Sequence, residues 1–218
     1  MDASSSPSPA VPTVASAVGA KIFSYIQANF QRGRIFFAED LEVLGEPTDH
    51  VRLALSELVQ DNFSIVRLAR GVFCYPRLDA RAKVILPDER DVASALAGRW
   101  GVRIVPCGEQ AALLAGLIPF GRYPLRFVSD GSYQYFNLQN GRKIEFLRRK
   151  SVKVFRFRNE ALRNLVEGFR WLGRDGFGEN ECAVARRTLR TVPDPDFSRE
   201  ILLAPGWIRQ LFSSLRTF

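Results

Sequence analysis

The chain has 218 residues, 46% of them hydrophobic and 25% charged, so it is long enough to bury a sizeable core and has the composition of an ordinary globular protein. Its formal net charge of +8 and pI near 9.9 favour a polyanionic partner, nucleic acid ahead of an acidic membrane surface. Arginine, present 26 times against five lysines, suits bidentate contacts to phosphate and guanine, although a GC-rich genome would produce the same excess.

The sequence does not support a membrane or secreted protein. No apolar run approaches the roughly 20 residues of a membrane-spanning helix. Residues 1–14 are rich in Ser, Pro and Ala and lack the basic start of a signal peptide, so we predict a disordered tail. The three cysteines, Cys74, Cys107 and Cys182, are odd in number and form no CxxC pair. We therefore expect a reducing, cytoplasmic compartment.

The first ordered segment is predicted to begin at residue 15. A helix over residues 15–30 has apolar residues at helical spacing and ends at Gln31-Arg32-Gly33. Residues 34–37 are typical of a short strand, and residues 38–44 of a short helix closed by Gly45.

The segment Pro47–Tyr75 is the most informative part of the chain. After Pro47, apolar residues fall on one face of a helical period: Val51, Ala54, Leu55, Leu58 and Val59. Asp61-Asn62 is expected to end this helix. Two β-prone runs follow, 65–68 and 72–75, and Gly71 between them favours a tight hairpin. Helix, strand, helix, helix and hairpin together predict a winged helix-turn-helix over residues 15–77.

Polar and basic side chains of this segment are the candidate DNA contacts. The outer face of the predicted recognition helix carries Arg52, and the hairpin adds two fixed positive charges. His50, the only histidine, lies in the first turn of the helix. The predicted DNA-contacting residues are Thr48, His50, Arg52, Ser56, Arg67 and Arg70. Any surface helix shows a similar polar face, and a solvated His50 is an equally good interpretation.

A second domain over residues 88–218 follows the linker-like residues 77–87. We expect a helix from Asp88 to Trp100, a strand over 102–105 and a short helix over 109–115. Three strands, 122–129, 133–138 and 143–148, are separated by Asp130-Gly131 and Asn140-Gly141, which both favour hairpins. The fold class is therefore α+β, with a small antiparallel sheet in the C-terminal domain.

Helices are predicted for the rest of the chain. One begins near Asn159 and ends at Gly173, and another covers residues 179–190 before Pro193 and Pro195 break it. The sequence Asp194-Pro195-Asp196 is expected to be a loop. A terminal helix over residues 207–215 has an apolar stripe that packs either on the C-terminal domain or on a second copy in a homodimer.

A second basic patch lies between Arg142 and Arg158. This stretch has eight positive charges against one acid, Glu145. The residues that we single out in it are Arg142, Lys143, Arg148, Arg149, Lys150 and Lys153. The interleaved aromatic residues suit base stacking, but ordinary sheet alternation explains them equally well. The charges are open to three partners: DNA, RNA or an acidic protein.

No catalytic or metal-binding pattern stands out. A single histidine excludes a two-histidine metal site and leaves no partner for a nucleophile pair. Gly131-Ser132 is not followed by the spaced Asp-x-Asp pair of a nucleotidyltransferase, and there is no Walker loop and no GxGxxG. We therefore expect a protein without enzyme activity, cofactor or metal.

Several short runs resemble one known family. They are 33-GRIFFAEDL-41, 51-VRLAL-55, 67-RLARGVF-73, 103-RIVPCG-108, 111-AALLAGL-117 and the Ser129-Asp130-Gly131 turn. In this order, over roughly residues 17–150, the chain resembles AbiEi-type antitoxins and their winged-helix relatives.

That resemblance implies a transcriptional regulator of a type IV toxin–antitoxin system. Such a protein represses its own operon by binding repeated or palindromic double-stranded DNA. In that family the nucleotidyltransferase activity belongs to the partner toxin, so a nucleotidyltransferase-like toxin is the implied protein partner. The alternative is that the winged helix serves protein contacts and the C-terminal domain binds RNA or an acidic protein through residues 142–158.

Overall fold

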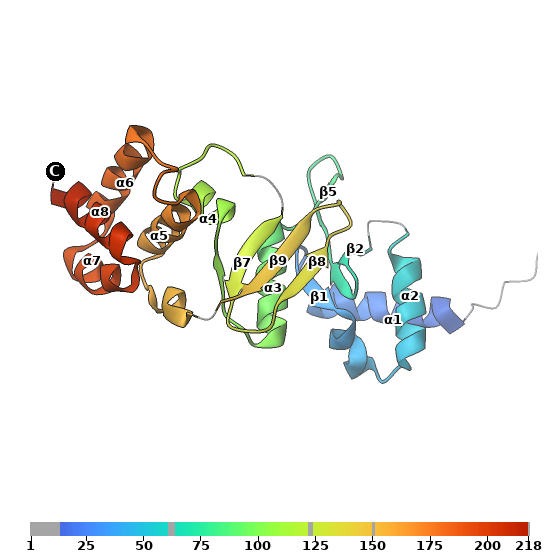
Figure 1. Cartoon of the computed structure of the whole chain (residues 1–218). Helices are drawn as coiled ribbons and strands as arrows, with labels where there is room; N and C mark the ends of the chain where they lie inside the picture. The colour runs from blue at the N-terminus through green and yellow to red at the C-terminus, as the bar shows by residue number, and fades with distance from the viewer. Residues whose placement is uncertain (1–13, 61–63, 122–123, 150, 218) are drawn as a thin grey trace, which may run out of the picture. The chain divides into compact units, whose positions relative to one another are not determined.

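The computed structural model describes residues 14–60, 64–121, 124–149 and 151–217, and the chain has an α+β fold (Figure 1). It divides into two compact units, an N-terminal unit of Met1–Asp88 and a C-terminal unit of Glu89–Phe218. The predicted tail up to residue 13, the predicted helix end at Asp61-Asn62, and Lys150 lie outside the described residues. In the described ranges, no helix combines the length and hydrophobicity needed to cross a lipid bilayer.

The N-terminal unit begins with the predicted order of elements. They are α1 (Val14–Asn29), β1 (Ile35–Phe37), the 3-10 helix η1 (Ala38–Leu44), α2 (Thr48–Leu58), β2 (Val66–Ala69) and β3 (Val72–Cys74). The three strands form an antiparallel sheet in the order β1-β3-β2, with Phe36 opposite Phe73. The hairpin predicted from Gly71 is confirmed, and Gly71 has a φ of 73°, a left-handed conformation that favours glycine.

A single apolar core joins these elements. The rings of Phe36 and Phe73 stack with centroids 5.6 Å apart, and Phe30 packs on Phe36 at 5.3 Å. On the helical side, Val51, Ala54 and Leu55 of α2 are buried against α1, as their spacing predicts. Consequently the opposite face of α2 is the one left to solvent.

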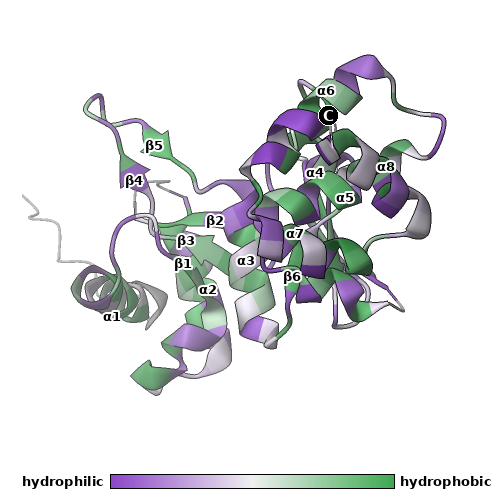
Figure 2. Cartoon of the chain, turned by 90° about the vertical axis from the view of Figure 1, so that its left-hand side faces the viewer, coloured by the Kyte–Doolittle hydropathy of each residue, from purple (hydrophilic) through white to green (hydrophobic). Residues whose placement is uncertain are grey.

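A second β-ribbon follows β3 where the sequence suggested only a linker. It consists of β4 (Arg77–Leu78) and β5 (Val84–Ile85), paired antiparallel with Leu78 opposite Val84. Figure 2 shows it as a hairpin that projects from the rest of the N-terminal unit. Two residues per strand are too few to produce a readable alternation, so periodicity missed the ribbon.

The sheet of the C-terminal unit is mixed, so the prediction of an antiparallel sheet is wrong. The unit begins with α3 (Glu89–Trp100), β6 (Ile104–Pro106), α4 (Glu109–Leu114), β7 (Leu125–Ser129), β8 (Gln134–Asn137) and β9 (Lys143–Arg148). The strand order is β6-β7-β9-β8, in which β7 and β9 are parallel. The hairpin predicted at Asn140-Gly141 is confirmed, since it joins β8 and β9.

The hairpin predicted at Asp130-Gly131 does not form, because β8 pairs with β9 and Asp130 binds Arg103 before β6. The Asp130 carboxylate accepts hydrogen bonds from the backbone amide and the Nε of Arg103, both at 2.8 Å. These bonds hold the start of β6 beside the end of β7. A Cβ at Gly131 would lie 2.7 Å from the Val102 side chain, so the chain passes close to β6 here and β8 pairs elsewhere.

The two faces of this sheet are covered differently. On one face, α3 places Trp100 against Phe136 and Phe146, with ring centroids 5.3 and 5.1 Å apart. On the other, Val105 and Val128 form a small core with Val154 of the 3-10 helix η2 (Val152–Arg156). The covering ends toward β8, where Tyr133 and Tyr135 are exposed.

The remaining helices form a separate layer around their own core. They are α5 (Glu160–Leu172), α6 (Glu179–Thr191), α7 (Asp194–Glu200), the 3-10 helix η3 (Ile201–Leu203) and α8 (Gly206–Thr217). The apolar stripe of α8, with Ile208, Phe212 and Leu215, is buried in this core. The loop predicted at Asp194-Pro195-Asp196 is instead the first turn of α7, where a proline costs no hydrogen bond.

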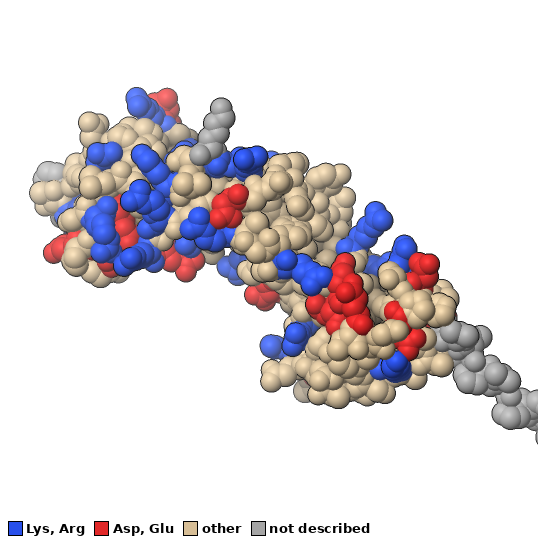
Figure 3. All heavy atoms as spheres, turned by 90° about the horizontal axis from the view of Figure 1, so that it is seen from below, with Lys and Arg blue, Asp and Glu red and all other residues tan. Residues whose placement is uncertain are grey.

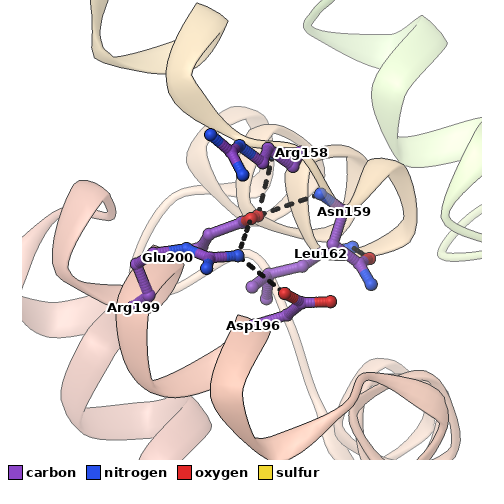
Figure 4. A network of polar contacts seen from close by, with 6 residues as sticks. All are labelled: Arg158, Asn159, Leu162, Asp196, Arg199 and Glu200. Carbon is purple, nitrogen blue, oxygen red and sulfur yellow. Dashed lines mark hydrogen bonds and ion pairs between the residues drawn. The ribbon is translucent and has the colours of Figure 1, made fainter.

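Glu200, 1% exposed, fastens α7 to the start of α5 (Figure 4). One carboxylate oxygen accepts hydrogen bonds from the backbone amides of Arg158 and Asn159, at 3.1 and 3.0 Å. The Asn159 side chain in turn accepts from Leu162 N and caps the helix. The backbone at the end of the basic stretch is therefore held in one position.

Candidate nucleic-acid interface

The excess of basic over acidic residues lies entirely in the C-terminal unit. The N-terminal unit contains nine Lys and Arg residues against ten Asp and Glu residues, whereas the C-terminal unit contains 22 against 13. Figure 3 shows basic side chains gathered over the C-terminal helices at its left-hand end, and acidic ones gathered on the N-terminal unit. Long-range attraction of a polyanion is thus a property of the C-terminal unit.

The exposed face of α2 carries most of the residues predicted to contact DNA. Thr48, His50, Arg52 and Ser56 are all exposed. Among the residues that the structure describes, the Arg52 side chain pairs with Asp49 alone, at 3.7 Å and with both side chains largely in solvent, so this pair holds it weakly. Ser56 Oγ donates to Arg52 O at 2.9 Å. Arg52 is the side chain on this face with the reach and freedom to contact a base edge.

The structure separates the two arginines of the hairpin. Arg70 is exposed in the turn beside Gly71 and has no side-chain partner among the described residues. Arg67 instead lies half-buried on β2, where Nη2 donates to Ser56 Oγ at 3.4 Å and the guanidinium stacks 5.5 Å from the Phe73 ring. Arg67 therefore joins the hairpin to α2, whereas Arg70 is presented to solvent.

Acidic residues surround the entrance to α2, a feature that the sequence reasoning did not weigh. Glu39 and Glu42 lie on η1, and Asp49 lies in the first turn of α2. Glu46, just before the helix, accepts a hydrogen bond from Lys21 at 2.5 Å. Carboxylates repel phosphate, so a duplex approaching α2 needs cations from other elements of the chain.

The basic stretch of residues 142–158 contains both free and engaged side chains. Those that are exposed and have no side-chain partner within the described residues are Lys143, Arg148, Lys153, Arg156 and Arg158. We call these five the free basic set. Sequence reasoning named Lys143, Arg148 and Lys153 as site residues, while Arg156 and Arg158 entered only through the charge count.

Two arginines predicted to belong to this patch are engaged in ion pairs. Arg149 donates to Glu167 at 2.7 Å, and Glu167 is only 2% exposed. Arg142 donates to Glu89 at the start of α3. Both pairs join elements of the fold, so these two arginines have a structural role beside their place in the predicted patch. The prediction for Lys150 falls outside the described residues.

The cysteines are buried or half-buried thiols. Desolvation raises the pKa of Cys107 to about 11, although Arg149 and Arg126 nearby lower it. Desolvation likewise raises the pKa of Cys74 to about 11. Thiols with such values are poor nucleophiles at neutral pH. In the described ranges, no group of three His, Cys, Asp or Glu side chains is arranged to hold a metal ion.

One protein family is similar to most of this chain. Its family model matches residues 21–194, from within α1 to the first residue of α7. It is described as a family of unknown function, DUF6088. The chain belongs to this family. The DUF6088 match spans the sheets of both units and the free basic set, while α8 lies beyond it. A comparison with curated proteins found no match.

Proposed function

We propose that this protein is a double-stranded-DNA-binding transcriptional regulator whose N-terminal unit is a winged helix-turn-helix. The observation that carries the proposal is the pairing of a solvent-facing polar face on α2 with an adjoining hairpin that has Arg70 at its turn. A helix of this kind enters the major groove, and a basic hairpin follows the backbone. The order of elements along the chain supports the assignment, because the β2–β3 hairpin is the next element after α2.

The two units contribute differently to binding in this proposal. The N-terminal unit is nearly neutral and carries the surface that reads base edges. The C-terminal unit supplies phosphate contacts through the free basic set, which give affinity without sequence preference. Together they form a protein whose affinity and specificity reside in separate parts of the chain.

The biological role that we propose is that of an antitoxin-like regulator of its own operon. The support is the resemblance of an ordered set of short runs in residues 17–150 to AbiEi-type antitoxins. In this role the protein binds a repeated or palindromic operator as a homodimer in the cytoplasm. It is not an enzyme, and a nucleotidyltransferase-like toxin is its protein partner.

The test is fluorescence anisotropy with the full chain and a duplex from the region upstream of its own gene. We expect salt-dependent binding that is tighter than binding to a scrambled duplex of equal length. Alanine at both Arg52 and Arg70 should remove that preference, whereas R187A, on an exposed arginine of α6, should keep it. Equal affinity for both duplexes would overturn the assignment of an operator-binding regulator.

The charge distribution favours one alternative function. Since the whole charge excess lies in the C-terminal unit, this unit is also suited to bind RNA or an acidic protein. Competition distinguishes the two. If single-stranded RNA displaces the duplex at much lower concentration than unlabelled duplex does, the alternative is favoured, whereas poor competition by RNA supports DNA binding.

A further inference from the structure

The N-terminal unit has few cations available for phosphate contacts. Arg67 stacks on Phe73, Lys21 is paired with Glu46, and Arg32 donates to Pro76 O at 3.1 Å while stacking on Tyr75. The exposed basic side chains in the described part of this unit that have no partner of their own, apart from the weakly paired Arg52, are Arg70, Arg81 and Lys83. Two of these three lie at the tip of the β4–β5 ribbon.

The hairpin β2–β3 is poorly placed to act as the main basic ribbon. All three residues of β3 are buried, and three of the four in β2 are buried as well. Only the turn, with Arg70, is presented to solvent. The β4–β5 ribbon has the opposite character, since its strands are half-buried or exposed and Ala80, Arg81, Ala82 and Lys83 at its tip are all exposed.

The tip of the ribbon is held in one conformation by Asp79. Its Oδ1 accepts hydrogen bonds from the backbone amides of Arg81 and Lys83, both at 2.8 Å. The Asp79 amide donates to Lys83 O at 3.0 Å, and Ala82 adopts a φ of 57°, which is uncommon for a residue other than glycine. The Asp79 carboxylate therefore orders the loop in which Arg81 and Lys83 are exposed to solvent.

The base of the ribbon is fixed to the body of the unit. Arg77 Nε donates to Arg32 O at 3.2 Å, and its side chain lies so close to Gly33 that a Cβ there would meet it at 2.4 Å. Ordering at the base and at the tip lowers the conformational entropy that Arg81 and Lys83 lose when they meet a phosphate.

We infer that the β4–β5 ribbon is a second DNA-contacting element of the N-terminal unit, in which Arg81 and Lys83 bind phosphates of the duplex backbone. The inference rests on the proposed function and deepens it. It adds Arg81 and Lys83 to the few cations that the N-terminal unit presents to solvent, in a unit with acidic residues at the start of α2.

The test is the salt dependence of anisotropy binding to a scrambled duplex, which isolates phosphate contacts. Removing two contacts in the variant R81A/K83A should flatten the slope of log K against log salt by about 1.8. The loss in affinity caused by the substitutions should therefore shrink about tenfold between 50 and 200 mM salt. The variant D79N keeps the acceptor oxygen and removes a negative charge, so it should bind more tightly than wild type.

The matched control is R187A/R209A, which removes the same charge from exposed, unpartnered arginines of the C-terminal unit. It should shift the slope by much less than R81A/K83A, and thermal melts should show all variants folded. An equal slope for the two double variants, or for R81A/K83A and wild type, overturns the inference and leaves binding through α2 intact. Absence of salt-dependent binding by the wild-type chain overturns the proposed function itself.

Discussion

The two units of this protein differ in what each offers a polyanion. The N-terminal unit carries α2, the helix that we propose reads DNA, with one face buried and the other exposed, but the unit has one more acidic residue than basic ones. The C-terminal unit has an excess of nine basic residues and no comparable reading helix on its basic stretch. Under the proposed function, the net positive charge and the surface that reads DNA therefore belong to different units of the chain.

The arginines of the C-terminal unit also fall into two groups, those in ion pairs within the fold and those exposed to solvent. Arg149 and Arg142 hold the fold together through Glu167 and Glu89, whereas the free basic set is presented to solvent. Counting charges along the sequence treats these groups as one. The following predictions test that separation first and the division between units afterwards.

The largest expected effect is on stability, in the variant R149A. It leaves the buried carboxylate of Glu167 with only Arg170, 3.8 Å away. An uncompensated buried charge costs about 3–5 kcal/mol, so the melting temperature should fall by roughly 6–20 °C. Thermal denaturation measures this. The double variant R149M/E167M should recover most of the loss, and failure to recover it would contradict the ion-pair account.

The next effect concerns DNA affinity. Glutamine at Arg148, Lys153, Arg156 and Arg158 removes up to four phosphate contacts and flattens the salt slope by up to about 3.6. The loss in affinity for a scrambled duplex should therefore be up to about a hundredfold larger at 50 mM than at 200 mM salt. Stability should be unchanged, because these side chains have no partner among the described residues. If the four substitutions leave the slope as it is in the wild type, the C-terminal unit does not supply the charge.

A smaller effect is expected at Glu200, which holds the backbone of Arg158. The variant E200A leaves the amides of Arg158 and Asn159 without their acceptor and should cost about 2 kcal/mol in unfolding free energy. Urea denaturation measures it. E200Q retains an acceptor oxygen and should lose clearly less. Equal losses in the two variants would mean that the amides are not the reason for the effect.

In the N-terminal unit, we expect R52A to act on sequence preference. One base-edge contact is worth about 1–3 kcal/mol, so the preference for the upstream duplex over a scrambled one should fall at least fivefold. The salt slope should change by no more than one phosphate contact. Competition titrations measure the ratio, and D49A, which frees Arg52 from its weak partner, should leave it unchanged or increase it.

The smallest predicted effect is the pH dependence at Asp130. The hydrogen bonds from Arg103 hold the pKa of this carboxyl below its usual value. A lowered folded-state pKa adds stability above the unfolded value near 4, and this contribution is lost as pH falls through the folded value. Wild type should therefore exceed D130N by at most about 1 kcal/mol at pH 7, and the difference should vanish in strong acid. A constant difference from pH 7 to pH 2 would contradict this.

Much of the fold follows from local patterns in the sequence. The apolar spacing in α2 and α5 gives helices because one face of each is buried, and Gly71 and Asn140-Gly141 close hairpins at their own positions. The mixed sheet could not be predicted in this way. Asp130-Gly131 satisfies the local rule for a hairpin, but a distant partner, Arg103, takes the carboxylate and changes the pairing.

The sequence predicts that the candidate site consists of exposed basic and polar side chains, but it does not predict for every basic residue whether it is exposed. Exposed Arg52 and Arg70 follow from helix periodicity and turn position. That Arg149 meets a buried Glu167, and that Arg67 lies on Phe73, depends on contacts across the fold. The β4–β5 ribbon is too short for a pattern, and the order at its tip comes from Asp79, whose hydrogen bonds are visible only in three dimensions.

The most direct test of the account is a salt titration of wild-type protein with the duplex upstream of its own gene and with its scrambled counterpart. The six proposed phosphate contacts predict that log K falls with log salt at a slope of about −5 for both duplexes, and that the upstream duplex binds more tightly at every salt concentration. A slope near zero, or equal affinity for the two duplexes throughout, would contradict it.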